Sequence, residues 1–171
     1  NSQKRSMSYK CKSDKTPLEV VAMERIDADG KAAAVEIVLP KAVKAPLVVI
    51  LSDPQHASGL RTVAIEDSNE KFPWGHLRFL NVTGGTLMIR YGTEVKPLPD
   101  GNTPTDIVPG GEARNLGVQF FAENEPDKIL YSGVWEHDPN IRKLVVITPG
   151  ADPSVKPLDI QVLPADKRIK K

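Results

Sequence analysis

The clearest alternation of hydrophobic and polar residues in this chain lies between Phe72 and Tyr91. Within it, Leu77–Val82 and Thr86–Tyr91 are rich in β-branched, aromatic and aliphatic residues, and they flank Thr83-Gly84-Gly85. Because glycine readily adopts the positive φ that tight turns need, this pattern predicts a hairpin. The second run places its apolar residues on one face, as in a half-buried antiparallel strand. The first run has apolar residues on both faces, which predicts a central strand.

Shorter apolar runs bounded by turn residues occur along the rest of the chain. Asp29-Gly30 predicts a hairpin turn, and Leu47–Leu51 is an apolar pentapeptide of the kind that forms a strand buried on both faces. Residues Thr93–Gly111 are dominated by proline, glycine, asparagine and aspartate, and they predict a long connection with one short extended piece near Val95–Leu98. The remaining predicted strands are Leu18–Asp27, Lys31–Leu39, Leu60–Glu66, Asn115–Ala122, Lys128–Trp135, Arg142–Thr148 and Pro157–Leu163.

These patterns predict an all-β fold. About ten strands without a helical period of ~3.6 residues indicate a two-layer antiparallel β-sandwich, immunoglobulin-like or jelly-roll-like, with Leu47–Leu51, Leu77–Val82 and Leu144–Ile147 as central strands. The 15 prolines and 12 glycines are in keeping with a chain of short strands and turns. The length of 171 residues suits a single domain, which we place at residues 16–163; the alternative is a split into two small domains near Ser68–Lys71.

Charge is divided unevenly along the chain. Residues 1–15 carry a net charge of +4 and residues 164–171 a net charge of +3, whereas the body between them carries −6. We predict that both basic segments are flexible tails. An acidic body argues against a nucleic-acid-binding domain, whose basic residues cluster on a folded face. Two interpretations of the tails stay open, namely solvated termini and weak electrostatic contact with an anionic surface.

The sequence also bears on location. No run approaches the roughly 18 consecutive apolar residues of a membrane span, so no transmembrane segment is expected. The chain begins at Asn1 rather than at methionine, which is compatible with a removed signal peptide and with export. Cys11, in the N-terminal tail, predicts a free surface thiol, with an intermolecular disulfide as the alternative.

Residue types that carry catalysis do not form a familiar pattern. His56, His76 and His137 lack metal-ligand spacing, and Glu136-His137-Asp138 is interpreted as an exposed turn rather than as a metal or acid–base site. No serine lies in a G-x-S-x-G motif, and neither glycine pair precedes a helix that would bind phosphate. We therefore expect no catalytic residue, no metal and no cofactor.

The aromatic residues are the candidates for ligand binding. Trp74, Tyr91, Tyr131 and Trp135 would supply the stacking surfaces that a sugar-binding sandwich needs. Aromatic residues make up only 5% of the chain, however, so a role in the core is the competing interpretation. Asn81-Val82-Thr83 matches the N-glycosylation sequon at a strand end, where a glycan would compete with packing, and we interpret it as a chance match.

Phe72-Pro73-Trp74-Gly75-His76-Leu77-Arg78-Phe79-Leu80-Asn81, followed by a hairpin and by the later run Arg142–Ile147, resembles uncharacterised, predicted exported β-rich proteins of Gram-negative bacteria. The resemblance covers about half of the chain. It implies a location in the cell envelope, periplasmic or otherwise exported, and brings no activity, cofactor or functional residue with it.

These observations lead to an expected function. We expect a non-catalytic structural or binding module of a bacterial cell envelope, with an unknown protein or glycan partner and no nucleic acid. A carbohydrate-binding β-sandwich module and a small hydrolase with an unrecognised site are the alternatives. A sugar binder must expose aromatic side chains, whereas a hydrolase must bring together acids or a histidine that lie apart in the sequence.

Overall fold

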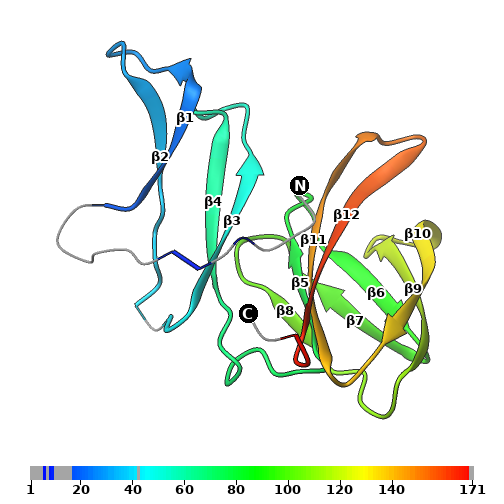
Figure 1. Ribbon diagram of the computed structural model, residues 1–171. Helices are drawn as coiled ribbons and strands as arrows, with labels where there is room; N and C mark the ends of the chain where they lie inside the picture. Colours follow the sequence, from blue (N-terminus) through cyan, green and yellow to red (C-terminus); the bar gives the residue numbers. More distant parts are fainter. Residues whose placement is uncertain (1–5, 7, 10–16, 42, 170–171) are drawn as a thin grey trace. The chain divides into compact units, whose positions relative to one another are not determined.

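The computed structural model describes residues 6, 8–9, 17–41 and 43–169 (Figure 1). These residues form strands and turns without a helix, so the predicted all-β class is confirmed. No helix in this part of the chain is long and apolar enough to cross a membrane. About ten strands were predicted, and the twelve observed are β1 Glu19–Ile26, β2 Ala32–Glu36, β3 Pro46–Ser52, β4 Leu60–Glu66, β5 Leu77–Asn81, β6 Leu87–Tyr91, β7 Glu94–Leu98, β8 Thr105–Ile107, β9 Arg114–Ala122, β10 Glu125–His137, β11 Ile141–Asp152 and β12 Lys156–Asp166.

The described chain divides into two compact units: residues 8–9, 17–41 and 43–71 form one, and residue 6 together with residues 72–169 forms the other. We call residues 17–41 and 43–71 the N-terminal unit and residues 72–169 the C-terminal unit. The boundary directly follows Ser68–Lys71, where the sequence placed the alternative split into two domains. The single domain over residues 16–163 stays a prediction.

The N-terminal unit begins with the hairpin of β1 and β2, which are antiparallel. The Asp27 side chain shapes its turn, because Oδ1 accepts hydrogen bonds from the backbone N–H groups of Asp29 and Lys31, both at 2.9 Å. Gly30 has a φ of 75°, which glycine adopts without steric cost. The hairpin predicted from Asp29-Gly30 is thus confirmed.

β3 and β4 form a second antiparallel hairpin in the same unit. Their sheet has two strands in the described structure, so β3 has a free edge, and Ile50 is 52% exposed. The prediction that Leu47–Leu51 is a central strand buried on both faces is therefore wrong. A short apolar run indicates a strand but does not determine how many neighbours that strand has, because neighbours depend on long-range pairing.

The C-terminal unit contains two four-stranded sheets, with the strand orders β10-β9-β6-β7 and β12-β11-β5-β8. β5 lies between β11 and β8, and β11 lies between β12 and β5, so the predicted central positions of Leu77–Val82 and Leu144–Ile147 are confirmed. β5 and β11 are parallel, which makes their sheet mixed rather than fully antiparallel.

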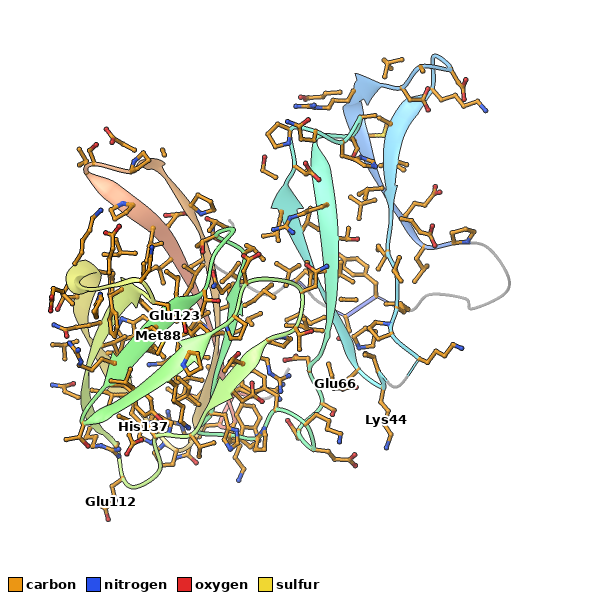
Figure 2. The ribbon with its side chains drawn as sticks, turned by 180° about the vertical axis from the view of Figure 1, so that it is seen from behind. Lys44, Glu66, Met88, Glu112, Glu123 and His137 are labelled. Atoms are coloured by element: carbon orange, nitrogen blue, oxygen red, sulfur yellow. The ribbon has the colours of Figure 1, made fainter. Side chains whose placement is uncertain are left out.

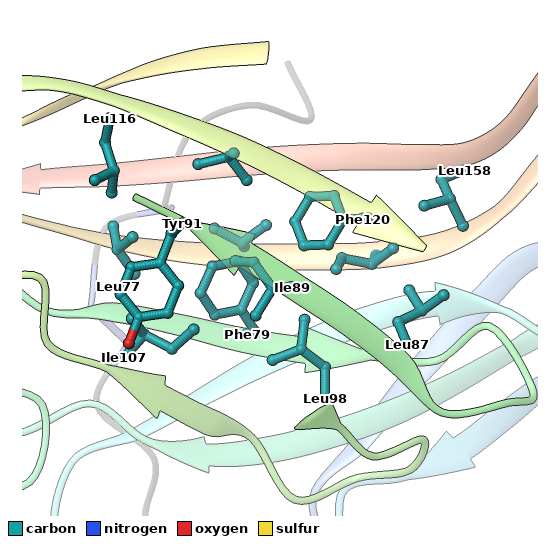
Figure 3. Packing of buried hydrophobic residues seen from close by; sticks show 13 residues of the cluster. Leu77, Phe79, Leu87, Ile89, Tyr91, Leu98, Ile107, Leu116, Phe120 and Leu158 are labelled. Carbon is teal, nitrogen blue, oxygen red and sulfur yellow. The ribbon is translucent and has the colours of Figure 1, made fainter. Parts of the chain in front are cut away.

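Both sheets contribute to one hydrophobic core (Figure 3). Phe79 of β5 lies at its centre, with its ring 6.1 Å from that of Phe120 in β9 and 6.1 Å from that of Trp135 in β10. A core shared by the inner faces of two sheets is the arrangement expected of a β-sandwich. The buried members of the cluster are Leu77, Phe79, Leu87, Ile89, Tyr91, Leu98, Ile107, Leu116, Val118, Phe120, Val145, Ile147 and Leu158.

The extended piece predicted near Val95–Leu98 is confirmed as β7, but the rest of Thr93–Gly111 is not the unbroken connection that its composition predicted, because it also contains β8. β7 pairs with β6, and β8 pairs with β5. Both lie at sheet edges, where Pro97 of β7 is tolerated because an edge strand does not need every N–H group for pairing. A segment rich in turn-forming residues can thus contain short edge strands that its composition does not predict.

The C-terminal boundary also differs from the prediction. β12 extends to Asp166, and the Arg168 guanidinium binds Asp166 at 2.7 Å and Asp138 at 3.0 Å. Residues 164–169 therefore lie against the C-terminal unit rather than forming a flexible tail. Apart from residues 6, 8 and 9, the predicted N-terminal tail lies outside the described residues, and so does Cys11.

Glu66, at the end of β4, joins the segment before β3 to the segment after β4 at the open end of the hairpin (Figure 2). Its carboxylate accepts hydrogen bonds from the backbone N–H groups of Lys44 at 2.6 Å, Ala45 at 3.2 Å and Ser68 at 2.9 Å. Burial of the carboxyl raises its pKa, but these hydrogen bonds outweigh burial and lower the pKa from 4.5 to about 2. The ionised form is therefore the one that stabilises the hairpin.

This shift predicts a pH dependence of stability. A carboxyl whose pKa is lower in the folded than in the unfolded chain stabilises the fold above the unfolded pKa and loses this contribution as the pH falls. We expect Glu66→Gln to reduce the loss of stability between pH 4.5 and about 2, measured by chemical denaturation across that range. Glu19→Gln in exposed β1 is the control. An unchanged acid profile in Glu66→Gln would contradict the assignment.

Candidate functional site

The four aromatic residues predicted to bind ligand make contacts typical of a core. Tyr91 is 6% exposed, inside the cluster of the C-terminal unit. Tyr131 and Trp135 pack against that cluster from β10, and Trp135 Nε1 donates a hydrogen bond to the Tyr131 hydroxyl at 2.9 Å. Trp74 is half-buried and lies 4.8 Å from the Arg142 guanidinium. Their role as ligand-binding residues stays a prediction, because these contacts by themselves account for their positions.

Buried charges in the C-terminal unit gather around Phe72. The Arg78 guanidinium lies 4.4 Å and the Arg142 guanidinium 5.1 Å from the centre of its ring. Arg142 Nη1 donates to the Phe72 carbonyl at 2.7 Å, and Arg78 binds both carboxylate oxygens of Asp106 at 2.6 Å. Each guanidinium thus has partners that compensate for its removal from water. We interpret this group as structural.

The histidines lie in separate places. His56 Nδ1 is 2.7 Å from the Ser58 hydroxyl, but this contact is local to a turn, and Ser58 is 2% exposed, so it does not present a nucleophile to solvent. His76 and His137 each have a buried ring nitrogen without a hydrogen-bond partner in the described structure. Within the described ranges, no three or more of His, Cys, Asp and Glu are placed to hold a metal ion.

His137 corrects the interpretation of Glu136-His137-Asp138 as an exposed turn, because His137 is 3% exposed at the end of β10. Burial lowers the pKa of its imidazole, and the nearby positive charge of Arg114 lowers it further, against an opposing hydrogen bond to the Gly111 backbone. Lys143 lies near it, and its ammonium donates to the Glu136 carbonyl. Burial and Arg114 thus favour the neutral form of His137, which is packed at the end of β10.

An open groove lies at the other end of the C-terminal unit. Its volume is about 580 Å³, within the range of roughly 300–1,000 Å³ that is usual for ligand sites. Leu87, Leu130 and Leu158 form its apolar floor. The residues that line it come from the β5–β6 turn and the start of β6, from the end of β9, the β9–β10 turn and β10, and from the facing ends of β11 and β12. They are Thr83, Gly84, Gly85, Thr86, Leu87, Ala122, Glu123, Asn124, Leu130, Pro149, Pro157 and Leu158.

One rim of the groove is held by the side chain of Asn81, which is 2% exposed. Its Nδ2 donates to the carbonyls of Gly85 at 2.9 Å and Leu98 at 2.7 Å. Its Oδ1 accepts from the Thr83 backbone N–H at 3.1 Å and from the Thr83 hydroxyl at 2.8 Å. All four hydrogen-bonding positions of the amide are used, so the turn has a fixed shape before any ligand arrives.

These bonds also bear on the sequon at Asn81. A glycan is attached through the side-chain nitrogen of asparagine, and here that nitrogen is buried and makes two hydrogen bonds. Attachment would require this end of β5 to open. The geometry supports our interpretation of the sequon as a chance match.

The opposite wall depends on a close approach of β11 and β12. A Cβ atom added to Gly150 would lie 1.7 Å from the Lys156 carbonyl oxygen, so that only glycine fits between the two backbones. Gly150 follows Pro149, and Lys156 precedes Pro157, both of which line the groove. The shape of this wall is therefore fixed by backbone packing.

The sequence indicated the turns but not the groove. Thr83-Gly84-Gly85 was recognised as a hairpin turn, and Glu123-Asn124 lies between two predicted strands. The two turns meet because Leu87 of β6 is paired with Ala122 of β9, strands that are far apart in the sequence. No local pattern signals such pairing, which is why Thr86, Glu123 and Asn124 were not among the predicted site residues.

We expect Asn81→Ala to lower the free energy of unfolding by about 1–3 kcal/mol, because it leaves buried backbone groups without partners. Urea denaturation measures the change. Asn124→Ala makes the same substitution at an exposed position of the groove and should change stability by about 0.5 kcal/mol or less. Equal effects of the two substitutions would contradict the role of Asn81.

We expect Gly150→Ala to destabilise the chain by about 1–3 kcal/mol, because the added methyl group forces β11 and β12 apart. Gly117→Ala is the matched control, since a Cβ at Gly117 of β9 meets open space. Thermal and urea denaturation of both variants would check this. A neutral Gly150→Ala would show that the wall of the groove is not packed as described.

No family model matches the chain, and a search of the curated proteins finds no similar sequence. The function is therefore argued from the groove and from its surroundings.

Proposed function

We propose that this protein is a non-catalytic binding module whose ligand occupies the groove at the end of the C-terminal unit. The observation that carries the proposal is the rim around Thr83, Gly84 and Gly85, which Asn81 holds from inside and Asp100 from outside. Asp100 Oδ1 accepts a hydrogen bond from the Gly84 backbone N–H at 2.8 Å. A rim fixed in this way loses little conformational entropy when a ligand binds.

The lining of the groove supports binding of a ligand that has both apolar and polar groups. Its floor is aliphatic, whereas Thr86, Glu123 and Asn124 add a hydroxyl, a carboxylate and an amide near the surface. Ligand sites commonly combine an apolar floor with a few polar groups that orient the ligand. The backbone N–H of Glu123 donates to the Thr86 carbonyl, whereas its carboxylate, labelled in Figure 2, has no hydrogen-bond or ion-pair partner among the described residues and is available to a ligand.

The alternatives make demands that the described residues meet less well. A carbohydrate-binding module needs exposed aromatic surfaces, but the twelve residues lining the groove include no aromatic side chain, and Tyr91, Tyr131 and Trp135 contact the core. A hydrolase needs a base and a nucleophile or paired acids at one open site. The location in a bacterial envelope is also our proposal, and it rests on the resemblance of the Phe72–Asn81 stretch.

Blocking the groove tests this function. Gly85 lines it, its φ is not positive, and a Cβ there meets open space, so Gly85→Gln adds a side chain to the groove without strain. Panels of oligosaccharides, peptides and amphiphiles would be screened by thermal shift and by chemical-shift perturbation of the intact chain. We expect a ligand that perturbs Thr86, Leu87 and Glu123 and that binds Gly85→Gln about tenfold more weakly.

Gly117→Gln is the control, because it makes the same change at an open position of β9 that does not line the groove. It should bind like the unmodified chain. Equal binding by both variants, or perturbations that map outside the groove, would contradict the proposal. So would turnover of a bound compound.

A further inference from the structure

β12 has a free edge beside the groove. It is the outermost strand of its sheet, with β11 as its neighbour on one side and no strand paired on the other among the described residues. β11 and β12 form a long hairpin in Figure 1. The free side of an edge strand presents backbone N–H and C=O groups that another strand can bind.

Two prolines reveal which residues present these groups. Pro149 is opposite Leu158, and Pro164 is opposite Lys143. Because proline has no N–H group, neither pair exchanges ladder hydrogen bonds, and alternate residues of β12 share this property. The register is continuous between the two pairs, so Leu158, Ile160 and Val162 direct their N–H and C=O groups away from β11.

Hydrogen bonds on the other side of β11 agree with this assignment. The Lys143 N–H donates to the His76 carbonyl at 3.0 Å, and the Ile147 carbonyl accepts from the Val82 N–H at 2.9 Å. Both residues of β11 thus direct backbone groups away from β12, as members of non-hydrogen-bonded pairs must.

The free edge begins inside the groove. Pro157 and Leu158 line the groove, and Ile160 is the next position along the edge with outward backbone groups. The Leu158 side chain belongs to the apolar floor. A strand added at this end of β12 would therefore place alternate side chains above Leu87, Leu130 and Leu158.

Charge around the groove favours a cationic ligand. The β9–β10 turn and the first residues of β10 contain Glu123, Glu125 and Asp127 against Lys128, which is paired with Glu125 at 3.2 Å. The β11–β12 hairpin contributes Lys156, which is already bound to the Asp159 carboxylate. Negative charge therefore remains uncompensated beside the groove, and it attracts Lys or Arg side chains.

We propose that the ligand of the groove is an extended polypeptide segment that adds as a strand to β12 at Leu158 and Ile160. An apolar side chain of the segment lies on the floor of the groove, and a neighbouring Lys or Arg binds Glu123. Main-chain hydrogen bonds give such strand addition its affinity, and the pockets for alternate side chains give its specificity. This inference rests on the proposed function, and it names the class of ligand.

The test selects random peptides of about seven residues, a length near that of a typical strand, on the immobilised intact chain. We expect enrichment of sequences in which Lys or Arg adjoins β-branched or aromatic residues. The best peptide is then resynthesised with N-methyl groups on alternate residues. Methylation in one of the two registers should abolish binding, whereas methylation in the other should not.

Two substitutions locate the contact on the protein. We expect Glu123→Gln to weaken peptide binding by about three- to tenfold and to reduce its dependence on salt. Glu112→Gln is the matched control, because Glu112 lies far from Glu123 in the same unit (Figure 2), and it should bind normally. Gly85→Gln should weaken binding of the same peptide, whereas Gly117→Gln should not.

The outcomes separate this inference from the proposed function. Without peptide enrichment, or with binding that is insensitive to N-methylation in both registers, strand addition fails. The inference that the ligand is cationic is overturned if the enriched peptides lack Lys and Arg, or if the Glu123→Gln variant binds normally. If another compound still binds and is lost in Gly85→Gln, the proposed function stands without this inference. If no compound of any class binds, both fail.

Discussion

The buried amide of Asn81 is the interaction on which the open end of the C-terminal unit depends. It sits at the last residue of β5, donates to Leu98 in β7 of the other sheet, and holds the turn that leads into β6. Both sheets and the groove rim are thus joined through one side chain. A buried amide is stable only when its donors and acceptors are satisfied, and here all are. The buried amide therefore holds the rim in one arrangement through its hydrogen bonds.

The two ends of the C-terminal unit differ in how their charged and polar groups are paired. β5 begins next to Phe72, where the guanidinium groups of Arg78 and Arg142 cover the ring, and it ends at Asn81 beside the groove. β11, parallel to β5, likewise runs from the Arg142 end toward Pro149. At the first end, charges are buried and paired. At the second, a carboxylate and the edge of a strand remain open, so binding is expected there.

Local chemistry made part of this fold predictable. The hairpins at Asp29-Gly30 and Gly84-Gly85 follow from turn residues, and β5 was predicted to be central because it is apolar on both faces. The same argument failed for Leu47–Leu51, since β3 pairs with one strand among the described residues. The sequence patterns also did not predict β8, a three-residue edge strand in a segment rich in proline and glycine. The groove arises where β6 meets β9 and where β11 turns into β12. Because β6 and β9 are far apart in the sequence, no short stretch of sequence predicts their pairing.

Free edges favour aggregation, and most edges of this unit are protected against it. β7 contains Pro97, and β8 has three residues, too few to guide the pairing of another chain. On β12, Pro164 has no N–H group to direct outward and limits the usable edge at one end, and the turn before Lys156 limits it at the other. Between them, Leu158–Leu163 contains neither lysine nor proline, so a short segment stays open for pairing while a long one is excluded. Such an edge suits a brief extended ligand better than a second sheet, because two long strands could not pair along it without meeting a proline.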